Sequence, residues 1–319
     1  VRTIPVEGTD AHPVFDIAGL AVRDSQIVVV DKQSATLTAY DLNGRFQYQA
    51  GRPGGGPGEF TNPMWIAYDA LGRLVVLESM SNTRLQILEA ETGQSIDVIT
   101  ENIIVPAYAH GEIEGEGGDQ KVIFYTSAPC TEDGETYCFV QEYNLSSKTV
   151  VRRFATRNEV NPDARPGTVP FIVGRDTEHK QTYVGHVNGD DIAIYNASGR
   201  FVRRFTIATA PTYRPLQTAD LPEDAHARVM AMGDMQYSKL RRIAPVDGDL
   251  VVSHLLSGVS ETPPTFISVF DAEEGVHRAT VPAEHLLQTI QGDRFFFVET
   301  DPSSDVGSYR VHEYRYTGV

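Results

Sequence analysis

The sequence predicts an all-β fold, a six-bladed β-propeller of four-stranded antiparallel blades. One observation is a short pattern that recurs along the chain: an aromatic or aliphatic residue, a polar pair and a Gly-type turn. The pattern starts at six places, spaced by 44 to 75 residues: Tyr40, Leu88, Tyr143, Tyr195, Phe270 and Tyr314. The other observation is that the segments around these turns are short β-branched runs with little helical periodicity. Four short strands in each unit of roughly 40 to 50 residues are typical of propeller blades.

Taken in order, the six units fill residues 1–319 as one domain. The predicted blades cover residues 14–50, 63–100, 103–156, 169–208, 237–282 and 284–319. In the first blade, turn residues separate four runs, which we expect to be strands: Ile17–Val22, Gln26–Asp31, Thr36–Asp41 and Arg45–Ala50.

The widest interval contains an insertion at residues 209–236. Pro222 and the two acids after it are typical of a helix start, with proline in the first turn and negative charge at the positive end of the dipole. Ala225, Val229 and Met232 then fall on one stripe, so we expect a short amphipathic helix that ends near Gly233.

The sixth unit has no further strand after its turn at Gly318, which would leave an unpaired edge. Residues 1–8 precede the first blade, and Val1–Val6 within them is strand-like. We therefore expect this segment to pair beside Ser308–Tyr314 and to complete the sixth blade. The alternative is that it pairs with the sixth blade of a neighbouring molecule, as in strand-exchanged assemblies.

The run from Gly51 to Phe60, Gly-Arg-Pro-Gly-Gly-Gly-Pro-Gly-Glu-Phe, resembles the start of an NHL repeat. The likeness continues at Pro63, Ile66, Ala67, Asp69, Gly72, Arg73, Leu74, Val76, Asn82, Arg84, Gln86, Ile87 and Gly93. It is specific over about residues 14–100, with Glu78 where the family usually has Asp. The resemblance implies a six-bladed NHL-type or TolB-like propeller, similar to exported bacterial proteins of that shape, but no shared activity.

Charge and hydropathy exclude several classes of partner. The chain carries 43 acidic and 27 basic side chains, a formal net charge of −16. Nucleic acids and anionic membranes are therefore unsuitable partners, because phosphate binding needs clustered Lys and Arg. No apolar run approaches the ~20 residues of a membrane-spanning helix, and no signal-peptide pattern is present. We expect any export signal to have been removed or never to have existed.

Cys130 and Cys138 are the two cysteines of the chain, and they bracket an Asp-Gly turn. Positions that face each other across a turn can meet the Cα separation of ~5.5 Å that a disulfide requires. A disulfide here favours an oxidising compartment, so the protein is expected in the periplasm, on the cell surface or outside the cell. The alternative is two unrelated buried thiols. No second Cys or His pair has ligand spacing, so no metal site is predicted.

Five long segments are expected to lie together at one end of the blades: residues 51–63, 126–137, 209–236, 254–264 and 299–307. Together they are strongly acidic. Long loops on a rigid scaffold are where binding concentrates, so we expect a face that binds a protein or glycan. A basic partner or Ca²⁺ would suit its charge, and plain solvation of the acids is the alternative.

The residues expected to contact a partner are Arg52, Phe60, Trp65 and Tyr213, because aromatic and Arg anchors are typical of interface centres. For Phe60 and Trp65, packing between blades is the alternative.

Motifs for catalysis are lacking. The nine histidines are scattered without ligand spacing, and no nucleophile elbow, zinc-protease helix or phosphate loop occurs. No catalytic residue and no cofactor is predicted, Ca²⁺ apart. The sequence thus favours a non-enzymatic exported binding protein. One alternative is a structural subunit of an envelope assembly or fibre, a homo-oligomer formed by terminal-strand exchange. Another is a metal-dependent lyase or lactonase-type hydrolase, an activity that some six-bladed relatives have.

Overall fold

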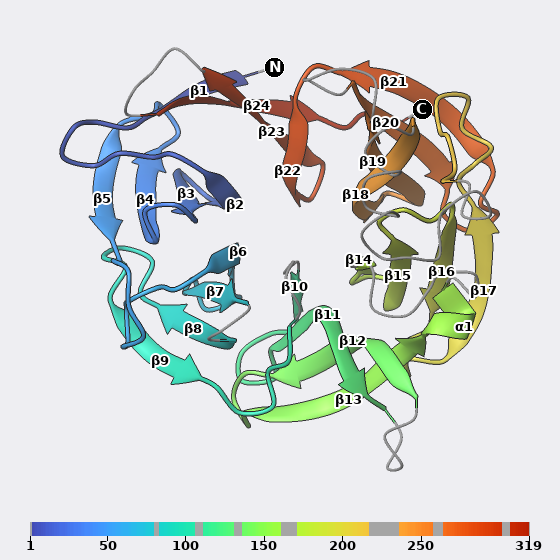
Figure 1. Cartoon of the computed structure of the whole chain (residues 1–319), viewed down its shortest axis with the longest axis horizontal. Helices are drawn as coiled ribbons and strands as arrows, with labels where there is room; N and C mark the ends of the chain where they lie inside the picture. The colour runs from blue at the N-terminus through green and yellow to red at the C-terminus, as the bar shows by residue number, and fades with distance from the viewer. Residues whose placement is uncertain are drawn as a thin grey trace, which may run out of the picture. The chain divides into compact units, whose positions relative to one another are not determined.

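The computed structural model describes residues 2–79, 83–105, 111–130, 136–160, 171–216, 236–257, 264–301 and 307–318. Within these residues, strands β1 to β24 form six four-stranded sheets, accompanied by one short helix (Figure 1). Neighbouring strands in the sheets run antiparallel. The chain is a six-bladed β-propeller, as predicted.

Residues Val1–Phe154 and Leu287–Tyr316 form one compact unit with four of the sheets. Three of these sheets follow chain order. The first sheet contains β2 (Ile17–Arg23), β3 (Gln26–Asp31), β4 (Thr36–Asp41) and β5 (Phe46–Ala50). The second contains β6 (Pro63–Tyr68), β7 (Leu74–Glu78), β8 (Arg84–Leu88) and β9 (Ser95–Ile99). The third contains β10 (Gly111–Glu114), β11 (Lys121–Pro129), β12 (Tyr137–Asn144) and β13 (Thr149–Thr156). The fourth sheet has the order β1 (Arg2–Glu7), β24 (Ser308–Arg315), β23 (Arg294–Asp301) and β22 (Leu286–Gln291).

Residues Ala155–Leu286 and Thr317–Val319 form the second unit. Its two sheets also follow chain order. They are β14 (Phe171–Asp176), β15 (Gln181–His186), β16 (Asp191–Tyr195) and β17 (Phe201–Thr206); and β18 (Tyr237–Val246), β19 (Asp249–Ser257), β20 (Thr265–Asp271) and β21 (His277–Ala283). A single helical turn, α1 (Arg157–Val160), precedes them. The helix predicted between Pro222 and Gly233 lies outside the described residues.

In five of the six sheets the recurring sequence pattern marks the turn between the third and fourth strands, and in the sixth it follows β24, the third strand. After β4, the Asp41 carboxylate accepts hydrogen bonds from the backbone N–H groups of Asn43 and Arg45 at 2.7 and 3.0 Å, and Gly44 takes a φ of 78°. The Asn196 side chain bonds its own turn in the same way after β16. A short polar side chain followed by a glycine at positive φ suits such a turn. The pattern recurs because the sheets share this turn chemistry.

Strand β1 completes the sheet that contains β22 to β24, as predicted from the missing last strand. It pairs antiparallel with residues 308–313 of β24, and Figure 1 shows the two side by side. Ile4 and Val6 are fully buried, and the residues between and beside them are exposed. The two buried side chains join an apolar cluster that includes Leu20 of β2 and Phe296 of β23. Through this cluster, β1 packs its own sheet against the first one.

Two buried acids, in the first and second sheets, each hold the segment that leads into the acid's own sheet. Asp31 ends β3 and accepts hydrogen bonds from the backbone N–H groups of Phe15 and Asp16 at 2.6 and 3.2 Å. Glu78 ends β7 and accepts one from the N–H of Thr61 at 2.6 Å. Both acids are fully buried. Glu78 therefore does in the second blade, with a longer side chain, what Asp31 does in the first.

Candidate metal centre

Of the four residues predicted to contact a partner, one is exposed. The Arg52 side chain is 77% exposed, and its guanidinium pairs with Glu59 at 2.7 Å. Phe60 is fully buried in the core between the first two sheets, and Trp65 lies in the core between the second and third. Tyr213 is buried in the core of the second unit. This burial gives the three rings a packing role and leaves Arg52 as the side chain that a partner could reach.

The predicted disulfide is present. Cys130 directly follows β11 and Cys138 lies on β12, with Cα atoms 5.4 Å apart. The bond joins the two strands at the end of their pairing, where Pro129 faces Tyr137.

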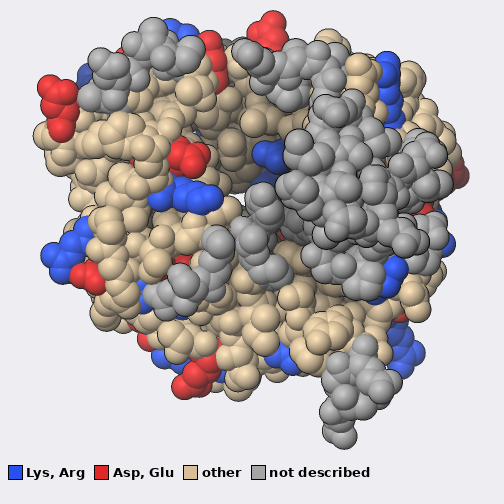
Figure 2. Space-filling view, viewed as in Figure 1, with Lys and Arg blue, Asp and Glu red and all other residues tan. Residues whose placement is uncertain are grey.

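The predicted acidic face stays a prediction, because four of its five long segments lie partly outside the described residues. The segment 51–63 is described throughout. Among the described residues on the side drawn in Figure 2, acidic and basic side chains are interspersed.

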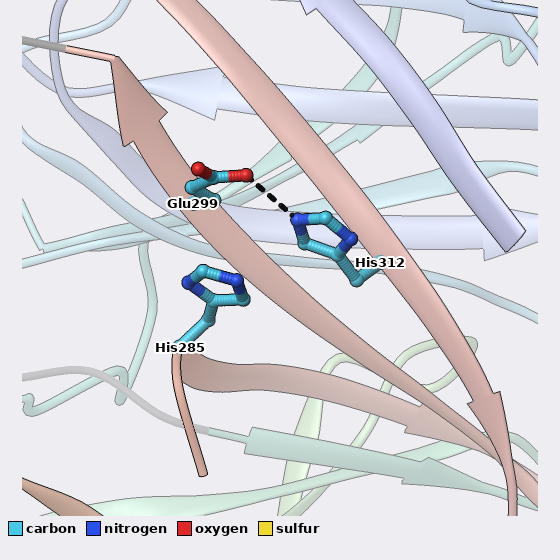
Figure 3. A group of neighbouring side chains, drawn as sticks. All are labelled: His285, Glu299 and His312. Carbon is cyan, nitrogen blue, oxygen red and sulfur yellow. Dashed lines mark hydrogen bonds and ion pairs between the residues drawn. The ribbon is translucent and has the colours of Figure 1, made fainter. Parts of the chain in front are cut away.

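Three side chains that could hold a metal ion meet on the sheet that β1 completes: His285, Glu299 and His312 (Figure 3). Glu299 lies on β23 opposite Arg310 of β24, which stands two residues before His312. Because residues two apart on a strand point to the same face, Glu299 and His312 are diagonal neighbours on one face of the sheet. His285 is joined directly to Leu286, where β22 begins, and β22 is the next strand of the same sheet.

The ring of His312 has a contact at each of its two nitrogens, one with Glu299 of the group and one with Thr3 outside it. Its Nε2 lies 2.9 Å from Glu299 Oε2, and its Nδ1 lies 3.2 Å from Oγ1 of Thr3 on β1. Arg310 donates to the other oxygen of Glu299, Oε1, at 3.2 Å. The His312 and Glu299 side chains are 13% and 30% exposed. The group is therefore shielded in part but within reach of ions in solution.

Two imidazoles and a carboxylate are a ligand set for a transition metal. Zn²⁺ binds imidazole nitrogen and carboxylate oxygen at about 2.0 to 2.2 Å, so neighbouring ligand atoms in a tetrahedral site lie about 3.3 Å apart. The Nε2 to Oε2 distance of 2.9 Å is close to that value. One ligand atom from each of the three residues lies within 4.8 Å of the others, so a bound ion would draw the widest pair together by up to about 1.5 Å.

The number and type of ligands narrow the choice of ion. Ca²⁺ prefers about six to eight oxygen ligands, whereas imidazole suits Zn²⁺, Cu²⁺, Ni²⁺ and Fe²⁺. Three protein ligands also leave a fourth tetrahedral position for water or another small ligand.

Residue spacing along the chain does not reveal this group. The three residues are separated by 14 and 13 positions, whereas zinc motifs commonly place two ligands within about five residues of each other. The signal that could have found them is strand register: pairing β23 with β24 as a hairpin sets Glu299 beside His312.

Among the described residues, no helix has the length and apolar character needed to cross a membrane.

Residues 1–110 match the family DUF5128, a family of 6-bladed β-propellers. No curated protein matches the sequence.

Three of the solved structures that share this fold come from Bacteroides species. A member of the DUF4221 family from Bacteroides vulgatus is 9% identical, with a TM-score of 0.61 over 99% of this chain and 97% of that chain. A candidate exported protein from Bacteroides fragilis is 10% identical, with a TM-score of 0.64 over 99% and 94%. The extracellular domain of a candidate one-component system from B. thetaiotaomicron is 10% identical, with a TM-score of 0.51 over 97% of this chain and 35% of that chain. At these identities the likeness shows the fold alone.

Proposed function

We propose that this six-bladed β-propeller binds a divalent transition metal ion, Zn²⁺ in the first instance, through His285, Glu299 and His312. The observation that carries the proposal is the convergence of their three ligand atoms to within 4.8 Å on one sheet. Thr3, on the far side of the His312 ring, stands where a ligating histidine usually has its outer-sphere partner. A plain hydrogen-bonded pair of Glu299 and His312 is the alternative role for these residues.

The surroundings of the group favour a cation. The net charge of −16 raises the local concentration of cations around the protein. Arg310 binds Glu299 Oε1 and leaves Oε2 turned toward His312. Arg310 thus orients the carboxylate from the side, as outer-sphere partners of metal ligands do.

We also propose that the protein works outside the cytoplasm, in the periplasm, on the cell surface or in the medium. The support for this location is the disulfide between Cys130 and Cys138, because such bonds persist in oxidising compartments.

Calorimetric titration of the chelator-treated protein with ZnCl₂ tests the metal site. The wild type should bind one ion per chain, and His285→Ala and His312→Ala should each lower the affinity at least ~100-fold, because even outer-sphere changes cost about 10- to 100-fold. His179→Ala is the matched control, since His179 is an exposed histidine paired with Asp176 at 2.9 Å.

A wild type that binds no Zn²⁺ at micromolar concentration would refute the proposal. Equal affinity in the wild type and in both ligand variants would refute it too, because the ion would then sit elsewhere. The enzymatic alternative, a metal-dependent lyase or lactonase-type hydrolase, needs a bound ion first, so the same titration tests its precondition.

A second candidate function, non-enzymatic binding of a protein or glycan, is favoured by the loop that carries Arg52. From β8, Arg84 donates to the backbone carbonyl of Glu59 at 2.7 Å, and Gln86 donates to the same oxygen at 2.6 Å. These hydrogen bonds from β8 therefore fix the loop, while the Arg52 side chain is exposed. A loop that is ordered before binding loses less conformational entropy when a partner binds.

A glycan array probed with the wild type and with Arg52→Ala tests this second function, with Lys32→Ala as an exposed control. We expect any specific hit to disappear in Arg52→Ala and to remain in Lys32→Ala. A hit that survives in Arg52→Ala contradicts the role of this loop.

A further inference from the structure

The first strand reaches into the metal centre, and we infer that docking of β1 and metal binding at His312 stabilise each other. This inference rests on the proposed metal-binding function. Thr3 of β1 and His312 of β24 are direct partners across the sheet, and Thr3 Oγ1 lies 3.2 Å from His312 Nδ1. Figure 3 shows the other ring nitrogen of His312 turned to Glu299.

Metal chemistry gives the Thr3 contact a defined role. If His312 binds the ion through Nε2, its proton resides on Nδ1, and a ligating histidine almost always donates that proton to an outer-sphere acceptor. The Thr3 hydroxyl oxygen is placed to accept it. Thr3 is thus a positioning residue, which holds the tautomer and the ring orientation that the metal needs.

Thr3 can do this only while β1 is docked. Side chains alternate along the strand, so Thr3 lies on the face of His312, and Ile4 and Val6 lie on the opposite face, fully buried. The apolar cluster around these two side chains contains residues of the first sheet, Leu20 and Tyr40 among them. Release of β1 would remove the apolar contacts and the Thr3 hydroxyl together.

Contacts at both ends of β1 strengthen this link to the first sheet. Near its start, the Arg2 guanidinium donates to the backbone carbonyl of Leu42 at 2.6 Å. At its end, the Tyr40 hydroxyl donates to the backbone carbonyl of Glu7 at 3.1 Å. Leu42 and Tyr40 belong to the end of β4 and the turn after it. The outer-sphere partner of His312 would thus be supplied by β1, a strand that also contacts the first sheet.

The size of the coupling follows from reciprocity. Loss of an outer-sphere partner typically weakens metal binding about 10- to 100-fold. If release of β1 lowers the affinity by that factor, saturating metal must lower the population of the released state by the same factor. Bound Zn²⁺ should therefore slow amide exchange in residues 2–7 by about 10- to 100-fold, where exchange proceeds through release of the strand.

Two measurements on the full chain test the inference, with ZnCl₂ as the probe. Calorimetry compares the wild type with Thr3→Val, which keeps the β-branched shape and removes the hydroxyl, and with Glu7→Gln as a control on the same strand. Hydrogen exchange followed by mass spectrometry compares residues 2–7 with and without Zn²⁺ in the wild type, Thr3→Val and His285→Ala.

We expect Thr3→Val to bind Zn²⁺ about 10- to 100-fold more weakly and Glu7→Gln to bind like the wild type. Zn²⁺ should protect residues 2–7 in the wild type and lose most of that effect in Thr3→Val and His285→Ala. Two results would refute the coupling while leaving the metal site in place, given a wild type that binds Zn²⁺ through His285 and His312. One is full Zn²⁺ affinity in Thr3→Val, and the other is an amide exchange rate in residues 2–7 that does not change when Zn²⁺ is added. Failure of the wild type to bind Zn²⁺ overturns the proposed function itself.

Discussion

Arg84→Met should be among the most damaging single substitutions in the first unit, because it leaves a buried carboxylate without its cation. The Arg84 and Glu78 side chains are 3% and 0% exposed and form an ion pair. Glu78 also accepts hydrogen bonds from the backbone N–H of Thr61 at 2.6 Å and from Gln86 Nε2 at 3.0 Å. These two neutral donors remain in the variant, but neither balances the negative charge.

The magnitude follows from the burial of both partners. Removal of one member of a buried ion pair costs about 3 to 5 kcal/mol, since the remaining charge stays out of water. Arg84 also donates to the backbone carbonyls of Gly55 and Glu59, so the variant also loses contacts to the loop that carries Arg52. We therefore expect the free energy of unfolding to fall by about 3 to 5 kcal/mol.

Urea unfolding followed by fluorescence measures this loss at the right place. The chain has one tryptophan, Trp65, and it lies on β6 opposite Leu77, the residue before Glu78. Its emission therefore reports on the sheet that contains the ion pair. Lys148→Met is the matched control, because Lys148 and Asp97 form an exposed pair, 44% and 34% exposed, and such pairs contribute about 0 to 1 kcal/mol.

A double variant separates the charge from the lost contacts. Glu78→Gln combined with Arg84→Met removes the unpaired charge and keeps a side chain of similar size, so it should be more stable than Arg84→Met alone. If Arg84→Met costs no more than Lys148→Met, the pair does not stabilise the sheet. If the double variant regains nothing, the stranded charge is not the cause of the loss.

Three further predictions concern other parts of the fold. Burial lowers the pKa of His186 and His254 from 6.5 to about 4. The free energy of unfolding should therefore be highest above pH 6.5, where both histidines are neutral in the folded and unfolded states, and should fall as the pH drops toward 4. At pH 5.5 each histidine should lower the free energy of unfolding by about 1 kcal/mol. Urea midpoints at pH 8 and pH 5.5 measure this loss, which should be smaller in His254→Gln than in the wild type. An equal fall of the midpoint in both proteins would contradict the prediction. Cys130→Ser with Cys138→Ser should lose about 2 to 3 kcal/mol and should unfold at the same urea concentration as the wild type in reductant. Gly44→Ala should displace β1 and speed amide exchange in residues 2–7, because Gly44 has a φ of 78° and a Cβ there would overlap the carbonyl oxygen of Pro5; Gly292→Ala, at a φ of 59° with open space around it, should leave that exchange unchanged.

Local sequence chemistry predicts the blades because their turns are built from neighbouring residues. In the turn after β4, the Asp41 carboxylate accepts hydrogen bonds from the backbone N–H groups of Asn43 and Arg45, and the backbone N–H of Gly44 donates to the carbonyl of Asp41. Strands β3 and β4 accordingly have their predicted bounds. The strand before them, β2, differs by one residue, because it ends at Arg23 instead of Val22. The pairing of β1 was also predictable, since a propeller blade of three strands leaves an open edge.

Interface anchors could not be predicted in the same way. Phe60 and Trp65 are aromatic, and aromatic side chains are frequent both in cores and at the centres of interfaces. What decides between the two is whether a neighbouring sheet covers the ring, and Phe60 lies between the first and second sheets with no exposed surface. That covering depends on how two blades pack, which no single blade's sequence pattern contains.

The candidate metal centre could not be predicted for a different reason, which is that its three residues become neighbours only through strand register. His285 directly precedes β22, Glu299 lies on β23 and His312 lies on β24, so no single strand contains more than one of the three residues. A slip of one residue between β23 and β24 would turn His312 away from Glu299 to the opposite face. The apolar residues of these strands oppose such a slip, because Phe296 and Val311 must both stay in the core that Ile4 and Val6 complete. The hydrophobic pattern therefore places the polar group, and the polar residues need no motif of their own to meet.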